Sequence, residues 1–216
     1  MRTLILMLIL TTLASIVQLG NGYPKATDRA ERWQLRLDTG DLRFYRAADT
    51  GAGYWILVYE VTNETDKDHR WIPQFDLVTD KGEIIPDGND VPRSVKLAVL
   101  AIFGDPLMQS QSDASGPLLQ GEENAIRSVA IWKAGREDIR EVQVFAGGVS
   151  GDTADIIHPI SGEKTKLHRV LQFSWGINGE IDDIIMKPLP RRPVDGGVSI
   201  RTPLSKEGVT RKWVFR

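Results

Sequence analysis

The chain has 216 residues, a formal net charge of −2 and no cysteine. This length is typical of one domain, and the charge gives no indication of a nucleic-acid partner. The lack of cysteine excludes the disulfide bonds that many small exported domains use, and it excludes a lipid anchor on a thiol.

Residues 1–22 have the composition of a secretory signal peptide. Arg2 supplies a positive charge, residues 4–17 are mostly apolar, and small residues precede a cleavage site after Gly22. The alternative is a retained membrane anchor, but the apolar stretch is shorter than the roughly 20 residues that span a bilayer. We expect an exported protein, periplasmic or extracellular, with a single domain at residues 23–216 and no membrane span after cleavage.

Alternation of apolar and polar residues, the pattern of half-buried strands, follows the signal peptide. Residues 33–37 and 42–44 alternate in this way, and the turn residues at 38–41 predict a hairpin between them. Residues 54–61 are β-branched, aromatic and apolar on both faces. They predict a central strand that is covered on both sides.

The middle of the chain predicts a strand pair and the one helix. Residues 75–85 indicate two strands joined by a turn at 80–82. Residues 91–103 lie between helix start and stop signals and predict a short helix, although their apolar second half leaves a buried strand open. Residues 109–116 are polar and predict a surface loop.

Further strands are expected at residues 126–132, 142–145, 167–175 and 213–215. Residues 187–208 are rich in proline and glycine and predict an extended segment. About eight short strands with one helix favour a mainly β fold, an antiparallel immunoglobulin-like β-sandwich.

No catalytic motif is complete in this sequence. Residues 148–151 lack the spacing of a serine nucleophile elbow. The acidic loops at residues 87–90 and 152–155 do not follow the spaced pattern of a calcium loop, and Asp, Asn and Gly are the usual residues of tight turns. We therefore expect no catalytic residue and no cofactor.

The three histidines are too widely spaced for a zinc motif, since His158 and His168 are the closest pair. We expect no metal site. The alternative function is an exported hydrolase or metal-dependent enzyme whose residues, among them His69, meet only in the folded protein.

Aromatic side chains are the remaining candidates for binding, because exposed rings bind sugars and partner proteins. Three of the six tryptophans fall within predicted strands and are expected in the core: Trp55, Trp132 and Trp175. Trp71 is the best candidate for an exposed ring. With its neighbours His69 and Arg70 it forms the predicted partner-binding site.

The end of the chain is basic. Residues 187–216 contain eight basic and two acidic residues, whereas the rest of the chain is acidic. Such a tail either lies across the acidic body of its own domain or contacts an anionic polymer of the cell envelope.

Several stretches resemble exported bacterial proteins of unknown function, of the planctomycete type, with immunoglobulin-like domains. The matching stretches are residues 54–63, 75–82, 118–125, 129–132, 144–151 and 212–216. The resemblance implies an exported sandwich and brings no catalytic residues. We expect a non-enzymatic domain that binds an envelope component or a partner protein, or else has a structural role in an envelope layer.

Overall fold

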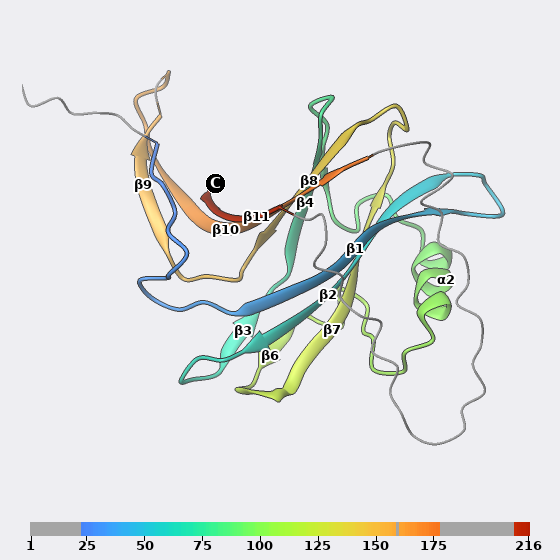
Figure 1. Ribbon diagram of the computed structural model, residues 1–216, viewed down its shortest axis with the longest axis horizontal. Coiled ribbons are helices and arrows are strands. Elements are labelled where there is room, and N and C mark those ends of the chain that lie inside the picture. Colours follow the sequence, from blue (N-terminus) through green and yellow to red (C-terminus); the bar gives the residue numbers. More distant parts are fainter. Residues whose placement is uncertain (1–22, 159, 178–209) are drawn as a thin grey trace, which may run out of the picture.

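The computed structural model describes residues 23–158, 160–177 and 210–216. The predicted signal peptide at residues 1–22 and the predicted extended segment at 187–208 lie outside these residues. Within the described part, the chain forms an antiparallel β-sandwich with one short helix, which confirms the expected fold class (Figure 1). The elements are β1 (Arg36–Arg46), β2 (Gly53–Asn63), β3 (His69–Trp71), β4 (Gln74–Thr79), β5 (Ile84–Pro86), α2 (Arg93–Phe103), β6 (Gly116–Leu118), β7 (Gly121–Lys133), β8 (Glu141–Gly147), β9 (Thr153–Ile157), β10 (Lys164–Gly176) and β11 (Thr210–Phe215).

The first sheet has the order β1-β2-β7, with β2 in the centre. Successive side chains of a strand point to opposite faces. Trp55 and Leu57 of β2 therefore belong to the core between the sheets, whereas Tyr54 and Ile56 belong to a second apolar cluster on the outer face. This arrangement confirms the prediction of a strand covered on both sides.

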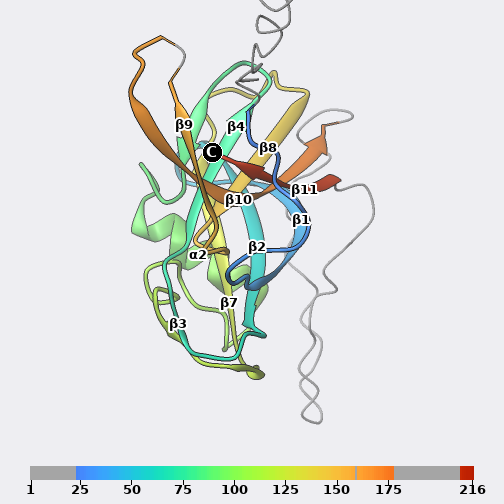
Figure 2. The ribbon, with the colours of Figure 1, turned by 90° about the vertical axis from the view of Figure 1, so that its left-hand side faces the viewer.

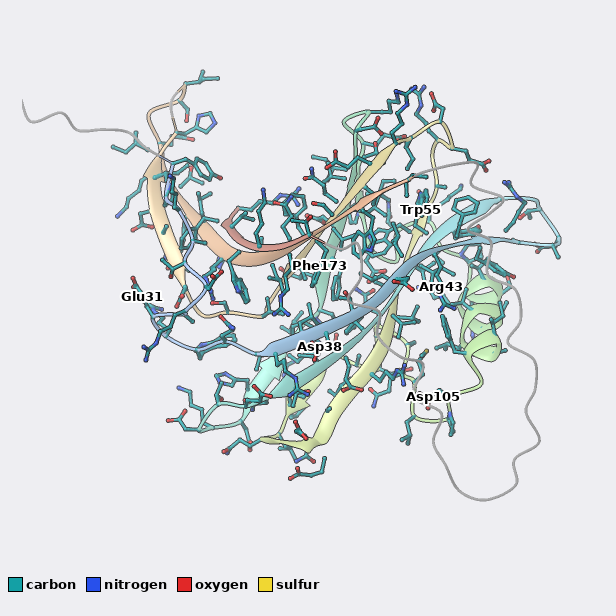
Figure 3. The ribbon with its side chains drawn as sticks, in the orientation of Figure 1. Glu31, Asp38, Arg43, Trp55, Asp105 and Phe173 are labelled. Atoms are coloured by element: carbon teal, nitrogen blue, oxygen red, sulfur yellow. The ribbon has the colours of Figure 1, made fainter. Side chains whose placement is uncertain are left out.

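The second sheet has the order β11-β10-β8-β4-β5, and β9 pairs with β10. Its inner face contributes Phe75, Val144 and Phe173 to the core. In Figure 3, Trp55 and Phe173 mark the two sheets that enclose this core. The β9–β10 hairpin projects from the sandwich, as Figure 2 shows.

Helix α2 covers the outer face of the first sheet, so the alternative of a strand in this segment is wrong. Val95 and Val99 are buried in the outer cluster together with Val129 of β7. The helix ends at Gly104, whose left-handed φ of 60° lets its N–H bond to the Leu100 carbonyl. The helix and the β9–β10 hairpin lie on opposite sides of the molecule (Figure 1).

The predicted hairpin at residues 33–44 is wrong. Residues 36–46 form one strand, β1, which pairs with β2 from Arg36 opposite Thr62 to Arg46 opposite Gly53. The register shifts between Thr39 and Leu42. Asp38 and Thr39 still pair with β2, and Gly40 and Asp41 form a bulge, which adds a residue to the strand without reversing it.

Candidate functional site

The candidate site is a groove of about 570 Å³ on the outer face of the second sheet. Because Leu77, Val144 and Leu171 point into the core, their sequence neighbours point outward. The outward side chains that line the groove come from β4, β8 and β10 and from the residue that follows β11. They are Gln74, Asp76, Phe145, His168, Val170 and Arg216. We call this the outer-face groove.

Arg216 lies over an aromatic ring in this groove. Its guanidinium carbon is 4.4 Å from the centroid of the Phe145 ring, and its Nη1 atom is 3.2 Å from Oδ2 of Asp76. The backbone of Arg216 exchanges two hydrogen bonds with His168, of 2.8 and 2.9 Å, which fix the end of the chain on β10. The result is a cation held on a ring face, an arrangement that the ring quadrupole stabilises.

Arg70 supplies a second cation. It is exposed, it lines the outer-face groove, and its guanidinium has no hydrogen-bond or ion-pair partner in the described part of the chain. Lys166 and Lys212 stand on the same outward-facing rows of β10 and β11 as His168 and Arg216, and both are exposed. Asp76 is the only acidic side chain in the lining that the structure describes. The surface around the groove is therefore cationic.

Trp33 also lines the groove. It is half-buried, its ring centroid is 4.3 Å from that of His69, and His69 Nε2 is 2.9 Å from the Thr65 hydroxyl. Burial, with a smaller effect of Lys67, lowers the pKa of His69. The ring is therefore neutral at neutral pH and adds no charge to the groove.

The N-terminal segment that carries Trp33 is tied to the sandwich by two buried charges. The Asp152 carboxylate accepts hydrogen bonds from the backbone N–H groups of Glu31 and Arg32, at 3.0 and 2.8 Å. Arg169, 1% exposed, donates to the Thr27 carbonyl at 2.7 Å and to Gln34 Oε1 at 2.8 Å.

The Arg169 guanidinium also lies 3.7 Å from the centroid of the Trp213 ring in β11. This one side chain therefore joins both ends of the described chain to β10.

The three residues of the predicted site at 69–71 lie in different surroundings in the structure. Arg70 lines the groove, and His69 lies against Trp33. The expectation that Trp71 is exposed is wrong, because its exposed fraction is 0% and its ring packs edge-on against Tyr59 and Phe75. Residues alternate across β3, so the outward position of Arg70 directs Trp71 into the core.

The three histidines do not form a metal site. Among the residues described, no group of three or more His, Cys, Asp or Glu side chains is placed to hold a metal ion. His158 lies instead in the turn between β9 and β10, where its Nδ1 atom accepts a hydrogen bond of 3.2 Å from the N–H of Ser161.

No helix within residues 23–158, 160–177 and 210–216 is long and apolar enough to cross a bilayer.

Fold and groove together define a class: an antiparallel β-sandwich with an open cationic groove, partly lined by aromatic rings, on an outer sheet face. Comparisons of the chain with protein-family models, with curated proteins and with solved structures found no match.

Proposed function

We propose that this chain is an exported, non-enzymatic immunoglobulin-like domain that binds an acidic polysaccharide of the cell envelope in the outer-face groove. The observation that supports the proposal most strongly is the pairing of cations with rings there. Arg216 lies over Phe145, and Arg70 stands in the same lining without a partner among the described residues.

Each part of the lining suits one feature of an acidic sugar chain. Guanidinium groups bind carboxylates through two parallel N–H donors. Exposed aromatic faces and edges provide apolar contact for sugar rings. The Gln74 side chain is exposed and can donate to or accept from hydroxyl groups.

The open shape of the groove favours a polymer over a small enclosed ligand. Lys166 and Lys212 extend the positive charge beyond the lining along β10 and β11. A chain longer than the groove would therefore meet further cations on both strands. Such binding depends on exposed charges and weakens as salt screens them.

The test compares polygalacturonate with dextran, which has the same kind of sugar ring without the carboxylate. We expect the purified protein to bind polygalacturonate in isothermal titration calorimetry and to bind dextran much more weakly. Arg70→Gln and Arg216→Gln should each weaken polygalacturonate binding by about tenfold, because each removes a charged hydrogen-bond donor.

Arg93→Gln is the matched control, since Arg93 is exposed on α2 on the opposite side of the sandwich. It should bind polygalacturonate as the unaltered protein does. Equal binding of dextran and polygalacturonate, or equal losses in all three variants, would contradict the proposal.

A further inference from the structure

Asp76 brings a negative charge to a groove whose other described charged side chains attract an acidic polymer. Its side chain is 43% exposed. It stands directly opposite Phe145 in the pairing of β4 with β8, and side chains at such paired positions are neighbours on one face of a sheet. A ligand that contacts the Phe145 ring therefore lies beside the Asp76 carboxylate.

The donor nitrogens of Arg216 differ in their access to a ligand. Nη1 is buried and lies 3.2 Å from Oδ2 of Asp76. Nε and Nη2 have no hydrogen-bond or ion-pair partner in the described part of the chain, and neither is a buried atom. Together they form an edge of the guanidinium that can bind a carboxylate through two parallel N–H donors. Asp76 thus occupies the inner nitrogen and leaves this edge open.

Three contacts fix the direction of the open edge. The guanidinium carbon lies 4.4 Å from the centroid of the Phe145 ring, Asp76 holds Nη1, and the backbone of Arg216 is hydrogen-bonded to that of His168. The donors are therefore oriented before a ligand arrives, which reduces the entropy lost on binding.

We propose that Asp76 makes the outer-face groove selective for an acidic polysaccharide with well-separated carboxylates, and weak for one with densely placed sulfate groups. This inference rests on the proposed function. One carboxylate of the ligand binds the edge formed by Nε and Nη2 of Arg216, while the carboxylates of neighbouring rings lie farther along the chain. A densely sulfated chain places a second anionic group next to the first, where Asp76 repels it.

The charge of the lining explains the direction of this selectivity. Arg70 and Arg216 contribute two positive charges to the described lining, and Asp76 reduces the net charge to +1, leaving His168 aside. Repulsion between like charges is strongest at short separation and is weakened by distance and salt. Specificity can arise from such repulsion of the wrong ligand. A surface that attracts anions by charge alone would instead prefer the more densely charged chain.

The test compares a short galacturonate oligosaccharide with a sulfated glucose oligosaccharide of the same length, at one salt concentration. Saturable NMR shifts of the backbone amide signals of Phe145 and Arg216 measure binding in the groove, apart from binding to other basic residues. We expect the purified protein to bind the galacturonate oligosaccharide more tightly. Asp76→Asn should strengthen binding of the sulfated oligosaccharide at least about fivefold and change binding of the galacturonate oligosaccharide by less than about twofold.

Two further variants separate charge from structure. Asp76→Glu keeps the negative charge and should keep the selectivity of the unaltered protein. Asp90→Asn removes the same charge outside the groove lining and should leave both affinities unchanged. Asp90 is exposed with a φ of 54°, a conformation that asparagine tolerates.

The outcomes distinguish this inference from the proposed function. No saturable shift with the galacturonate oligosaccharide would overturn both. Binding of this oligosaccharide, together with equally tight binding of the sulfated one by the unaltered protein, would overturn the selectivity alone. An unchanged ratio of the two affinities in Asp76→Asn would also overturn the role of Asp76 and leave the proposed function standing.

Discussion

The substitution Asp87→Asn tests the buried carboxylate through the stability of the protein. Burial raises the pKa of Asp87 to about 7, compared with about 3.9 in an unfolded chain. The folded protein therefore holds the proton more tightly than the unfolded chain does. The stability that results is fully present below pH 3.9 and is lost as the pH rises through the folded pKa of about 7.

The size of the effect follows from the two pKa values. Each pH unit between them lowers the free energy of unfolding by about 1.4 kcal/mol. Between pH 5 and pH 8 the loss is about 2–3 kcal/mol. Asparagine keeps the acceptor for the Ile131 N–H but never ionises. The variant should therefore gain about 2–3 kcal/mol relative to the unaltered protein over this range.

Urea unfolding followed by tryptophan fluorescence at several pH values measures this difference. The other ionisable groups that act on or respond to Asp87 are Lys96 and Tyr59, and both remain in the variant. Asp90→Asn, at an exposed position of the same turn, should show no such gain. Parallel curves of stability against pH for Asp87→Asn and the unaltered protein would refute the reasoning.

Three further predictions concern the rest of the structure. Gly148 (φ 78°) and Gly162 (φ 71°) both have left-handed backbones, but a Cβ at Gly148 would lie 2.6 Å from the Ile72 carbonyl oxygen and one at Gly162 would meet nothing within 4 Å. In urea unfolding, Gly162→Ala should lower the free energy of unfolding by about 1 kcal/mol and Gly148→Ala by at least about 2 kcal/mol. A larger loss for Gly162→Ala than for Gly148→Ala would contradict this prediction. Arg169→Met should destabilise the protein by about 3 kcal/mol, because the polar contacts of a buried charge are lost. The same substitution should speed proteolysis within residues 23–34, and an unchanged rate of cleavage would contradict the role of Arg169 in anchoring this segment. In titration calorimetry, the affinity for polygalacturonate should fall as the salt concentration rises, and it should fall more steeply for the unaltered protein than for Arg70→Gln. Equal salt dependence of the two affinities would exclude Arg70 from contact with the polysaccharide.

The sequence predicted the main strands well where the pattern of apolar residues reflects which faces of the strand are covered. Residues 54–61 are apolar on both faces because β2 lies between the inter-sheet core and helix α2. The helix at residues 91–103 was ambiguous in its apolar half. Only the outer cluster, where Val95 and Val99 pack on the first sheet, distinguishes a helix from a strand there.

The errors arise where distant residues decide the structure. Turn residues at 38–41 predicted a reversal, but β1 pairs with β2 before and after them, so that only Gly40 and Asp41 leave the regular register, as a bulge. Trp71 has polar neighbours in sequence, and its burial depends on Tyr59 and Phe75.

The groove could be predicted only in part. Arg70 was a candidate from its neighbours, but Phe145 and Arg216 meet through the pairing of β8, β10 and β11 across a long stretch of chain. One feature of the sequence indicated that Arg169 is buried: it occupies an apolar position in the alternating pattern from Leu167 to Trp175. Such a residue indicates a buried charge that needs partners, but the row does not show which ones.

The most direct test of the proposed function locates the bound sugar. An NMR titration with a short galacturonate oligosaccharide would follow the backbone amide signals of the purified protein. We expect the largest saturable shifts at Phe145, His168 and Arg216, with no change along α2. Largest shifts along α2, or none in the outer-face groove, would contradict the account.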